Sequence, residues 1–168
     1  SGHPEIPVIS LSAVALGEDN PGFKITPALL KQAVYAVLFG DVMMQMLYRC
    51  RPYEAKPGAA NALYEEYMAR ARKLAPKFNR HNYTKLCREA IRAFDSMPLV
   101  GEGTKPRVGV VGEILVKFHP TANNHVVDVI EREGCEAVVP GLLDFFLYSM
   151  SNAELQKDEL GSSATARA

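Results

Sequence analysis

A strand, a polar loop, a helix and a second strand follow one another between residues 105 and 146, and this order constrains the fold more than any other feature of the chain. The apolar run from Arg107 to Val111 is typical of a buried parallel strand. Residues Asn123 to Arg132 carry apolar side chains at helical spacing, and Gly134 then ends the helix. Residues Glu136 to Val139 form the next strand. This order predicts a βαβ unit with parallel strands.

The loop that joins the first strand to the helix is the first candidate binding site. In open α/β sheets, ligands lie at the carboxyl ends of the strands, where this loop is expected. Its basic side chains offer positive charge or donors, and its small polar side chains stand at a helix start, which favours an anion or carbonyl group. The candidate ligand-binding residues are Gly112, Glu113, Lys117, His119, Thr121, Asn123 and Asn124. A structural alternative stays open, in which Thr121 or Asn123 caps the helix and Lys117 and His119 are solvated.

A second candidate site lies at Arg49 and Arg51, at the end of a long helix. Two arginines this close can hold a carboxylate or a CoA phosphate through forked hydrogen bonds. The alternative is that they complement the dipole of the helix end, with Tyr53 packed beneath and Glu54 paired to one of them. The sequence contains no nucleophile elbow, paired-carboxylate motif, H-E-x-x-H motif or phosphate loop, so no catalytic residue is predicted.

The part of the chain before the βαβ unit is predicted to be mainly helical. One helix begins at Thr26, as N-cap, and covers about residues 27–49. A second covers about residues 59–75, and a third, capped by Asn82, covers about residues 83–94. The side chains expected on their buried faces are Leu30, Val34, Val37, Leu38, Met44, Leu47, Leu63, Tyr67, Met68, Leu86, Ile91 and Phe94.

These elements divide the chain into three parts. Residues 1–97 form a mainly helical segment, residues 98–150 the βαβ unit with a final short helix from Leu142 to Met150, and residues 151–168 a polar tail. Two strands are too few to bury both faces of a parallel sheet. The predicted fold class is therefore α/β, a helical segment followed by a partial Rossmann- or flavodoxin-like lobe, and the chain is expected to be a fragment of a larger fold.

Composition argues against several classes of partner. The chain has 48% hydrophobic and 23% charged residues and a formal net charge of zero, so no global field attracts nucleic acid or an anionic membrane. Lys31 and Asp41 interrupt the most apolar window, residues 28–48, which favours a core helix over a membrane span. Three cysteines without a C-x-x-C pair fit a reducing cytoplasm and predict no metal site.

Four segments of the chain resemble one protein family. They are NPGFKIT (20–26), YRCRPYE (48–54), PGAANALYEEY (57–67) and, as the most specific, the stretch 105–140 with GEILVKFHPTANN at its centre. These segments resemble the 2-hydroxyacyl-CoA dehydratase-like region of activase-related proteins, large cytoplasmic proteins of mostly anaerobic bacteria. The group is related to the 2-hydroxyglutaryl-CoA dehydratase and benzoyl-CoA reductase systems and includes a CoA-substrate-specific enzyme activase part.

The resemblance implies a parent protein with a [4Fe–4S] cluster and ATP that takes part in ATP-driven electron transfer in acyl-CoA metabolism. The loop residues that match the family pattern are Gly112, Glu113, Lys117, His119, Asn123 and Asn124. The chain departs from the family in lacking its glycine-rich phosphate motifs and a recognisable cysteine motif for a cluster. We therefore expect an excised domain that is catalytically silent alone and holds no cofactor itself.

The expected partners are the remaining domains of the parent protein, an activase or sister subunit, and acyl-CoA. Two other functions stay open. The helices over residues 27–95 would bind an activase or sister subunit in a docking domain, and loop 112–124 would then be structural. In a small-ligand-binding domain, the same loop would bind its ligand without redox chemistry.

Overall fold

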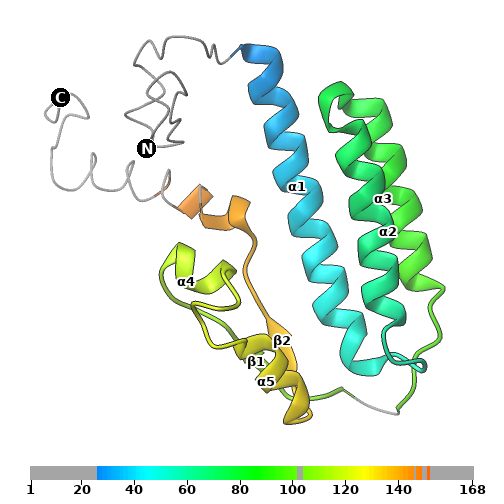
Figure 1. Ribbon diagram of the computed structural model, residues 1–168, viewed down its shortest axis with the longest axis vertical. Coiled ribbons are helices and arrows are strands. Elements are labelled where there is room, and N and C mark those ends of the chain that lie inside the picture. Colours follow the sequence, from blue (N-terminus) through cyan, green and yellow to red (C-terminus); the bar gives the residue numbers. More distant parts are fainter. Residues whose placement is uncertain (1–25, 102–103, 146, 149–150, 152–168) are drawn as a thin grey trace, which may run out of the picture.

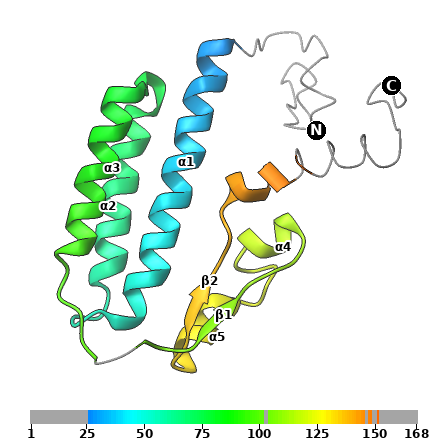
Figure 2. The same ribbon diagram turned by 180° about the vertical axis from the view of Figure 1, so that it is seen from behind.

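The computed structural model describes residues 26–101, 104–145, 147–148 and 151. Helix α1 (Pro27–Cys50) stands between two regions (Figure 1). On one side lie α2 (Ala59–Leu74) and α3 (Arg80–Asp95), and on the other side lies a small parallel sheet with two short helices (Figure 2). The structure is mostly helical with a small two-stranded parallel sheet, which is compatible with the predicted α/β class. The apolar residues 6–10 predict a short strand, which lies outside the described residues, as does the polar tail apart from Ser151.

Helix α1 begins and ends close to the predicted residues. Thr26 is its N-cap, and the hydroxyl oxygen accepts a hydrogen bond from the backbone N–H of Leu29 at 3.2 Å. After Cys50 the chain tightens into the 3₁₀ helix η2 (Arg51–Tyr53), which contains Pro52. Proline has no N–H to continue the helical ladder, so its position accounts for the end of α1.

The starts of α2 and α3 depend on side chains that lie before them. Gly58 precedes α2 with φ 86°, and the Glu54 carboxylate accepts from the backbone N–H groups of Gly58 and Ala60 at 2.6 and 2.8 Å. Asn79 caps α3, and the side chain of Asn82 returns a bond to the Asn79 N–H, which completes a capping box. The prediction of Asn82 as the cap was wrong by three residues. The N-cap is Asn79, and Asn82 is the residue at N3 whose side chain completes the capping box.

The hydrophobic core lies within the helical bundle. Each helix contributes one narrow stripe of buried side chains to this core. Short turns, including η3 (Ala75–Lys77), bring further residues to the core. The buried residues of this cluster are Phe39, Met43, Leu47, Ala60, Tyr67, Ala71, Phe78, Leu86, Ala90, Phe94 and Met97. The spacing of four residues along α1 and α3 places each stripe on a single face of its helix.

The predicted buried face of α1 was too broad. Leu47 is buried, but Leu30 and Val34 are 54% and 46% exposed, and the sequence prediction missed Phe39 and Met43. The first half of α1 meets the bundle through a different face, since the ring centres of Tyr35 and of Tyr83 on α3 are 4.9 Å apart. The same error applies to Ile91 on α3, which is exposed. Hydrophobicity alone does not show how wide the covered face is.

Among the described residues, α1 with the turn that follows it, Pro27–Tyr53, is the one segment long and apolar enough to cross a membrane by length and composition. The core helix of a globular protein passes the same test. The second half of α1 carries Phe39, Met43 and Leu47 into the bundle core. The burial of these side chains explains why the second half of α1 is apolar.

The sheet consists of β1 (Arg107–Gly109) and β2 (Glu136–Val138). The strands are parallel and adjacent, with Arg107 opposite Glu136 and Gly109 opposite Val138, as predicted. The expectation of a buried first strand was wrong except at Val110, because all of β1 is exposed and Val111 is 84% exposed. The described elements cover β2 with α1 and leave β1 uncovered (Figure 1).

The connection between the strands differs from the predicted loop and helix. It contains a short helix, α4 (Ile114–Phe118), where only a polar loop was expected. The second helix, α5 (Val126–Arg132), begins three residues later than predicted, because Asn124 and His125 adopt positive φ values of 55° and 54°. Gly134 ends α5 with φ 81°, as predicted. Residues 142–145 and 147–148 are helical, in agreement with the final helix expected there.

Candidate functional site

The first two residues of the predicted binding loop shape the backbone. Gly112 has φ 150°, a conformation that side-chain-bearing residues rarely adopt. Glu113 is the N-cap of α4, and its carboxylate accepts from the N–H groups of Leu115 and Val116 at 2.7 and 3.2 Å. The carboxylate thus satisfies two of the first N–H groups of α4, a helix that the sequence did not predict.

His119 and Thr121 lie exposed in the turn between α4 and α5. The Nδ1 atom of His119 accepts from the backbone N–H of Ala122 at 3.3 Å. The carbonyl of Thr121 accepts from the N–H of Asn124 at 3.5 Å. These contacts stabilise the turn, and ligand binding by either side chain stays a prediction.

Asn123 joins α4 to α5. Its Nδ2 donates to the carbonyls of Val116 and Lys117 at 3.0 and 3.3 Å, and its Oδ1 accepts from the N–H of Val126 at 3.3 Å. Asn124 next to it occupies the left-handed region, which asparagine tolerates better than most residues. Asn123 thus accepts from the first N–H of α5, as the capping alternative requires, but the N-cap position is taken by His125, and the bonds to the α4 carbonyls were not foreseen.

Arg51 forms the main polar link between the bundle and the βαβ unit. Its Nε and Nη2 atoms donate to the two carboxylate oxygens of Glu131 at 2.7 and 3.0 Å, and Nη2 lies 3.5 Å from Asp128. Burial raises the pKa of Glu131, and the charge of Arg51 offsets part of that rise. This bidentate pair occupies the fork that was expected to hold a carboxylate or CoA phosphate of a ligand.

A second polar link surrounds Glu136, the buried acidic residue of β2. Its carboxylate accepts from the hydroxyl of Tyr53 at 3.1 Å and lies 3.2 Å from Nε of Arg107. The backbone N–H of Lys105 donates to the Tyr53 oxygen at 2.9 Å. Tyr53 therefore binds the βαβ unit. The expectation that Glu54 pairs with an arginine was wrong, because its carboxylate caps α2.

A third polar link comes from Asp41, in the middle of α1. Its two carboxylate oxygens accept from the backbone N–H groups of Leu142 and Leu143, each at 2.8 Å, at the start of the last helical segment. A Cβ atom added to Gly141 would lie 2.8 Å from Asp41 Oδ2, so glycine is required for this close approach. The sequence reading took Asp41 only as a charge in an apolar helix.

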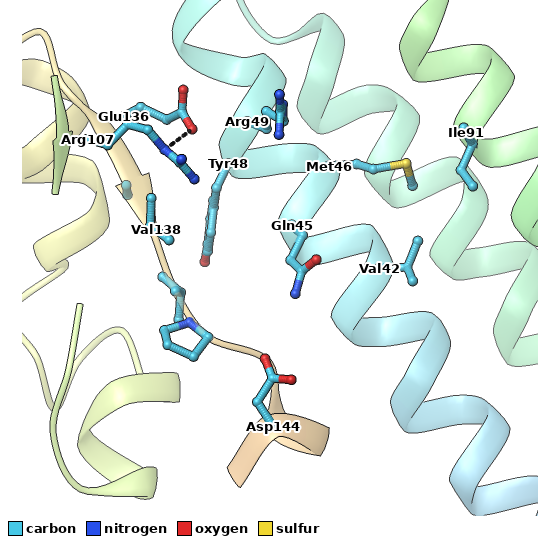
Figure 3. A pocket seen from close by; sticks show the side chains of 13 residues that line it. Val42, Gln45, Met46, Tyr48, Arg49, Ile91, Arg107, Glu136, Val138 and Asp144 are labelled. Carbon is cyan, nitrogen blue, oxygen red and sulfur yellow. Dashed lines mark ion pairs between the residues drawn. The ribbon is translucent and has the colours of Figure 1, made fainter. Parts of the chain in front are cut away.

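An open cavity of about 510 Å³ lies between α1 and β2, and Arg49 is at its wall. Figure 3 shows Gln45, Tyr48 and Arg49 on the α1 side, across from Val138 and the Arg107–Glu136 pair. The sequence predicted one site for Arg49 and Arg51, but the two side chains lie in different surroundings.

A neighbouring cavity of about 330 Å³ lies between the bundle and the α4–α5 connection. It brings together three of the predicted site residues, Arg51, Lys117 and Asn123. It also collects side chains that were not predicted as site residues: Tyr48, Tyr64 and His125. Tyr48 and Val139 line both cavities and therefore separate them. The two tyrosines lie on different helices, so no local spacing in the sequence could have linked them.

The three cysteines belong to different parts of the fold. Cys50 ends α1, Cys87 lies in α3, and Cys135 lies between α5 and β2. Within the described ranges, no three His, Cys, Asp or Glu side chains are grouped to hold a metal ion. Burial raises the pKa of the Cys50 and Cys87 thiols, which keeps both protonated at neutral pH.

Comparison of the chain with protein-family models, with curated proteins and with solved structures found no match.

Proposed function

We propose that the chain is a domain of a longer, cytoplasmic 2-hydroxyacyl-CoA dehydratase-like protein that takes part in ATP-driven electron transfer in acyl-CoA metabolism. In this proposal the domain is a scaffold, while the [4Fe–4S] cluster and ATP belong to other parts of the parent protein. The resemblance of residues 105–140 supports the family, and the unfinished sheet supports a domain that is completed by further structure.

The exposed outer edge of β1 is the observation that carries this proposal. Val110 donates to the carbonyl of Val138, and Pro106 accepts from the N–H of Glu136, so these alternate residues face β2. Arg107 and Gly109 therefore direct their backbone groups away from β2, and no described residue pairs with them. Parallel strands are normally covered and paired on both sides, which favours completion of a Rossmann- or flavodoxin-like lobe at this edge.

The test of the function is the iron and acid-labile sulfide content of the parent protein and of this chain, both purified without oxygen. We expect iron and sulfide in the parent and none in the chain. A parent without iron would exclude the electron-transfer function, and dehydration or ATP hydrolysis by the chain alone would exclude the scaffold role.

Hydrogen exchange tests the completed lobe separately. The amides of Arg107 and Gly109 should exchange at least about tenfold more slowly in the parent than in the chain, because a new strand would bind them. The amide of Val110, which is already bonded to Val138, is the internal control. Equal exchange of Arg107 and Gly109 in both proteins would show that no strand pairs with β1.

A docking domain is the second candidate, favoured by the exposed apolar side chains on the first half of α1. Leu30 and Val34 lie one helical turn apart and are both exposed. Their replacement by glutamate should abolish binding to a purified activase or sister subunit and leave the stability of the chain nearly unchanged. Lys31→Glu, on the same part of α1, is the matched control. Unchanged binding by the Leu30 and Val34 variants would exclude this docking surface.

A further inference from the structure

The smaller cavity, between α1, α2 and the α4–α5 connection, has both apolar and polar walls. Met44 and Leu47 of α1 line it from the bundle side. Phe118, Val127 and Val139 line it from the βαβ side. Its volume of about 330 Å³ is near the lower end of the range of ligand sites, roughly 300–1,000 Å³. The cavity therefore suits a small molecule with a hydrocarbon body.

Two tyrosines, Tyr48 and Tyr64, line this cavity. Burial is the main cause that raises the pKa of Tyr48 and of Tyr64, so both hydroxyls keep their protons at neutral pH. Neither hydroxyl has a hydrogen-bond partner among the described residues. Neither counts as a buried polar atom without a partner, so solvent reaches both. These donors are free to bind a ligand.

The charges around the cavity leave one cation without a carboxylate. Arg51 is paired with Glu131 and Asp128, and the second oxygen of Asp128 lies 3.4 Å from Nδ1 of His125. Lys117 has no carboxylate partner in the described part of the chain, and its ammonium group lies 4.7 Å from the Phe118 ring centre. The carboxylates of Glu131 and Asp128 balance the charges of Arg51 and Lys117, and Lys117 is the cation that has no carboxylate neighbour among these described residues.

We propose that this cavity binds a small organic anion, a monocarboxylate with a short apolar body. Lys117 pairs with the carboxylate, the hydroxyls of Tyr48 and Tyr64 donate hydrogen bonds to it, and the apolar walls receive the hydrocarbon part. One ammonium group with two neutral donors matches a single negative charge. A phosphate dianion is a poorer fit, because Arg51, the other strong donor, is already paired with carboxylates. This site is independent of the proposed function in electron transfer.

The experiment is a fluorine NMR titration of 4-fluorophenylacetate with the full chain. We expect saturable binding that Lys117→Gln weakens about tenfold or more, because a hydrogen-bonded ion pair is lost. Tyr64→Phe should weaken binding about threefold, because it removes one neutral donor and keeps the ring. Circular dichroism and urea unfolding establish that both variants are folded.

Two controls distinguish this site from other causes of binding. Lys85→Gln removes a cation from the basic surface groove of α3, which also contains Arg80, Arg88 and Arg92, and it should leave the affinity unchanged. The neutral 4-fluorophenylacetamide should bind at least about tenfold more weakly than the carboxylate. Equal binding of acid and amide would mean an apolar cavity without anion recognition. Loss of binding in Lys85→Gln with retention in Lys117→Gln would place the anion on α3. Either result overturns the proposal, as does an absence of binding.

Discussion

The helical bundle and the βαβ unit differ in how they bury apolar side chains. The bundle encloses Phe39, Met43 and Leu86 almost completely, and its three helices supply the contacts. In the βαβ unit, the buried apolar residues are small or medium in size, Val110, Ala137 and Val139, while Val111 is exposed. Polar links to α1 and η2 hold this unit, at Arg51, Glu136 and Asp41. We infer that hydrophobic burial stabilises the first region, whereas the position of the second depends on hydrogen bonds and ion pairs.

The largest expected effect is a loss of core packing in the bundle. Phe39 is 1% exposed, and its ring centre lies 6.5 Å from the ring centre of Phe78. Phe39→Ala should lower the free energy of unfolding by about 3–5 kcal/mol, measured by urea unfolding. Val34→Ala, on the exposed part of the same helix, should lower it by about 0.5 kcal/mol or less. Similar losses from both variants would contradict the narrow core stripe.

The next effect concerns the link between the two regions. Arg51→Met leaves the Glu131 carboxylate, only 14% exposed, without its partner. We expect a loss of about 2–3 kcal/mol, somewhat below the range for fully buried pairs because both side chains keep some contact with water. Arg72→Met breaks an exposed pair with Glu65 and should cost about 0.5 kcal/mol or less. A loss from Arg51→Met as small as that of the control would show that the link contributes little.

Local patterns in the sequence predicted the parts of the fold that depend on neighbouring residues. Thr26 and Pro27 identified the start of α1, and Gly134 identified the end of α5, because capping and positive φ are local requirements. The exposure of Val34 and Val111 could not be predicted, since it depends on which distant elements cover them. In the sequence, an apolar run that another element covers cannot be told from one that stays exposed.

The candidate site was predicted less well, for the same reason. Lys117 and Asn123, which were chosen because they follow a strand end, line a cavity, and their binding of a ligand stays a prediction. The partners of Arg51 were missed, since Glu131 and Asp128 are distant in the sequence. Tyr48 was read as part of a helix end, and its place between two cavities follows only from the packing of β2 against α1.

A smaller effect is expected at the third link, where Asp41 accepts two backbone N–H groups. Asp41→Ala should cost about 1 kcal/mol, as for the loss of a helix cap. The amides of Leu142 and Leu143 should then exchange faster with deuterium. Asp41→Asn keeps an acceptor and should retain most of the protection. Asp95→Ala, at an exposed position, is the control. Unchanged exchange in Asp41→Ala would show that the last helical segment is not held by this contact.

The smallest expected effect is a pH dependence caused by Glu131, because Arg51 opposes the influence of burial. The pKa of Glu131 is raised above its ordinary value in the folded chain. Between the ordinary and the raised pKa, the folded state therefore binds more protons than the unfolded state. The free energy of unfolding should fall as the pH rises through that window and become independent of Glu131 above it. Urea unfolding at a series of pH values measures this slope.

Glu131→Gln removes the titrating group and should remove this contribution to the slope, whereas the exposed Glu133→Gln should leave it in place. The sign of the difference in slope between the wild-type chain and Glu131→Gln shows whether burial or Arg51 has the larger effect on the pKa of Glu131. If the wild-type chain gains stability relative to Glu131→Gln as the pH rises through the window, Arg51 outweighs desolvation, and the pKa of Glu131 is lowered. The Arg51 link would then be a net attraction strong enough to hold the βαβ unit without apolar burial. A fall in stability means instead that Arg51 offsets only part of the cost of burying the Glu131 charge, and that Asp41 and Glu136 supply the rest of the attachment.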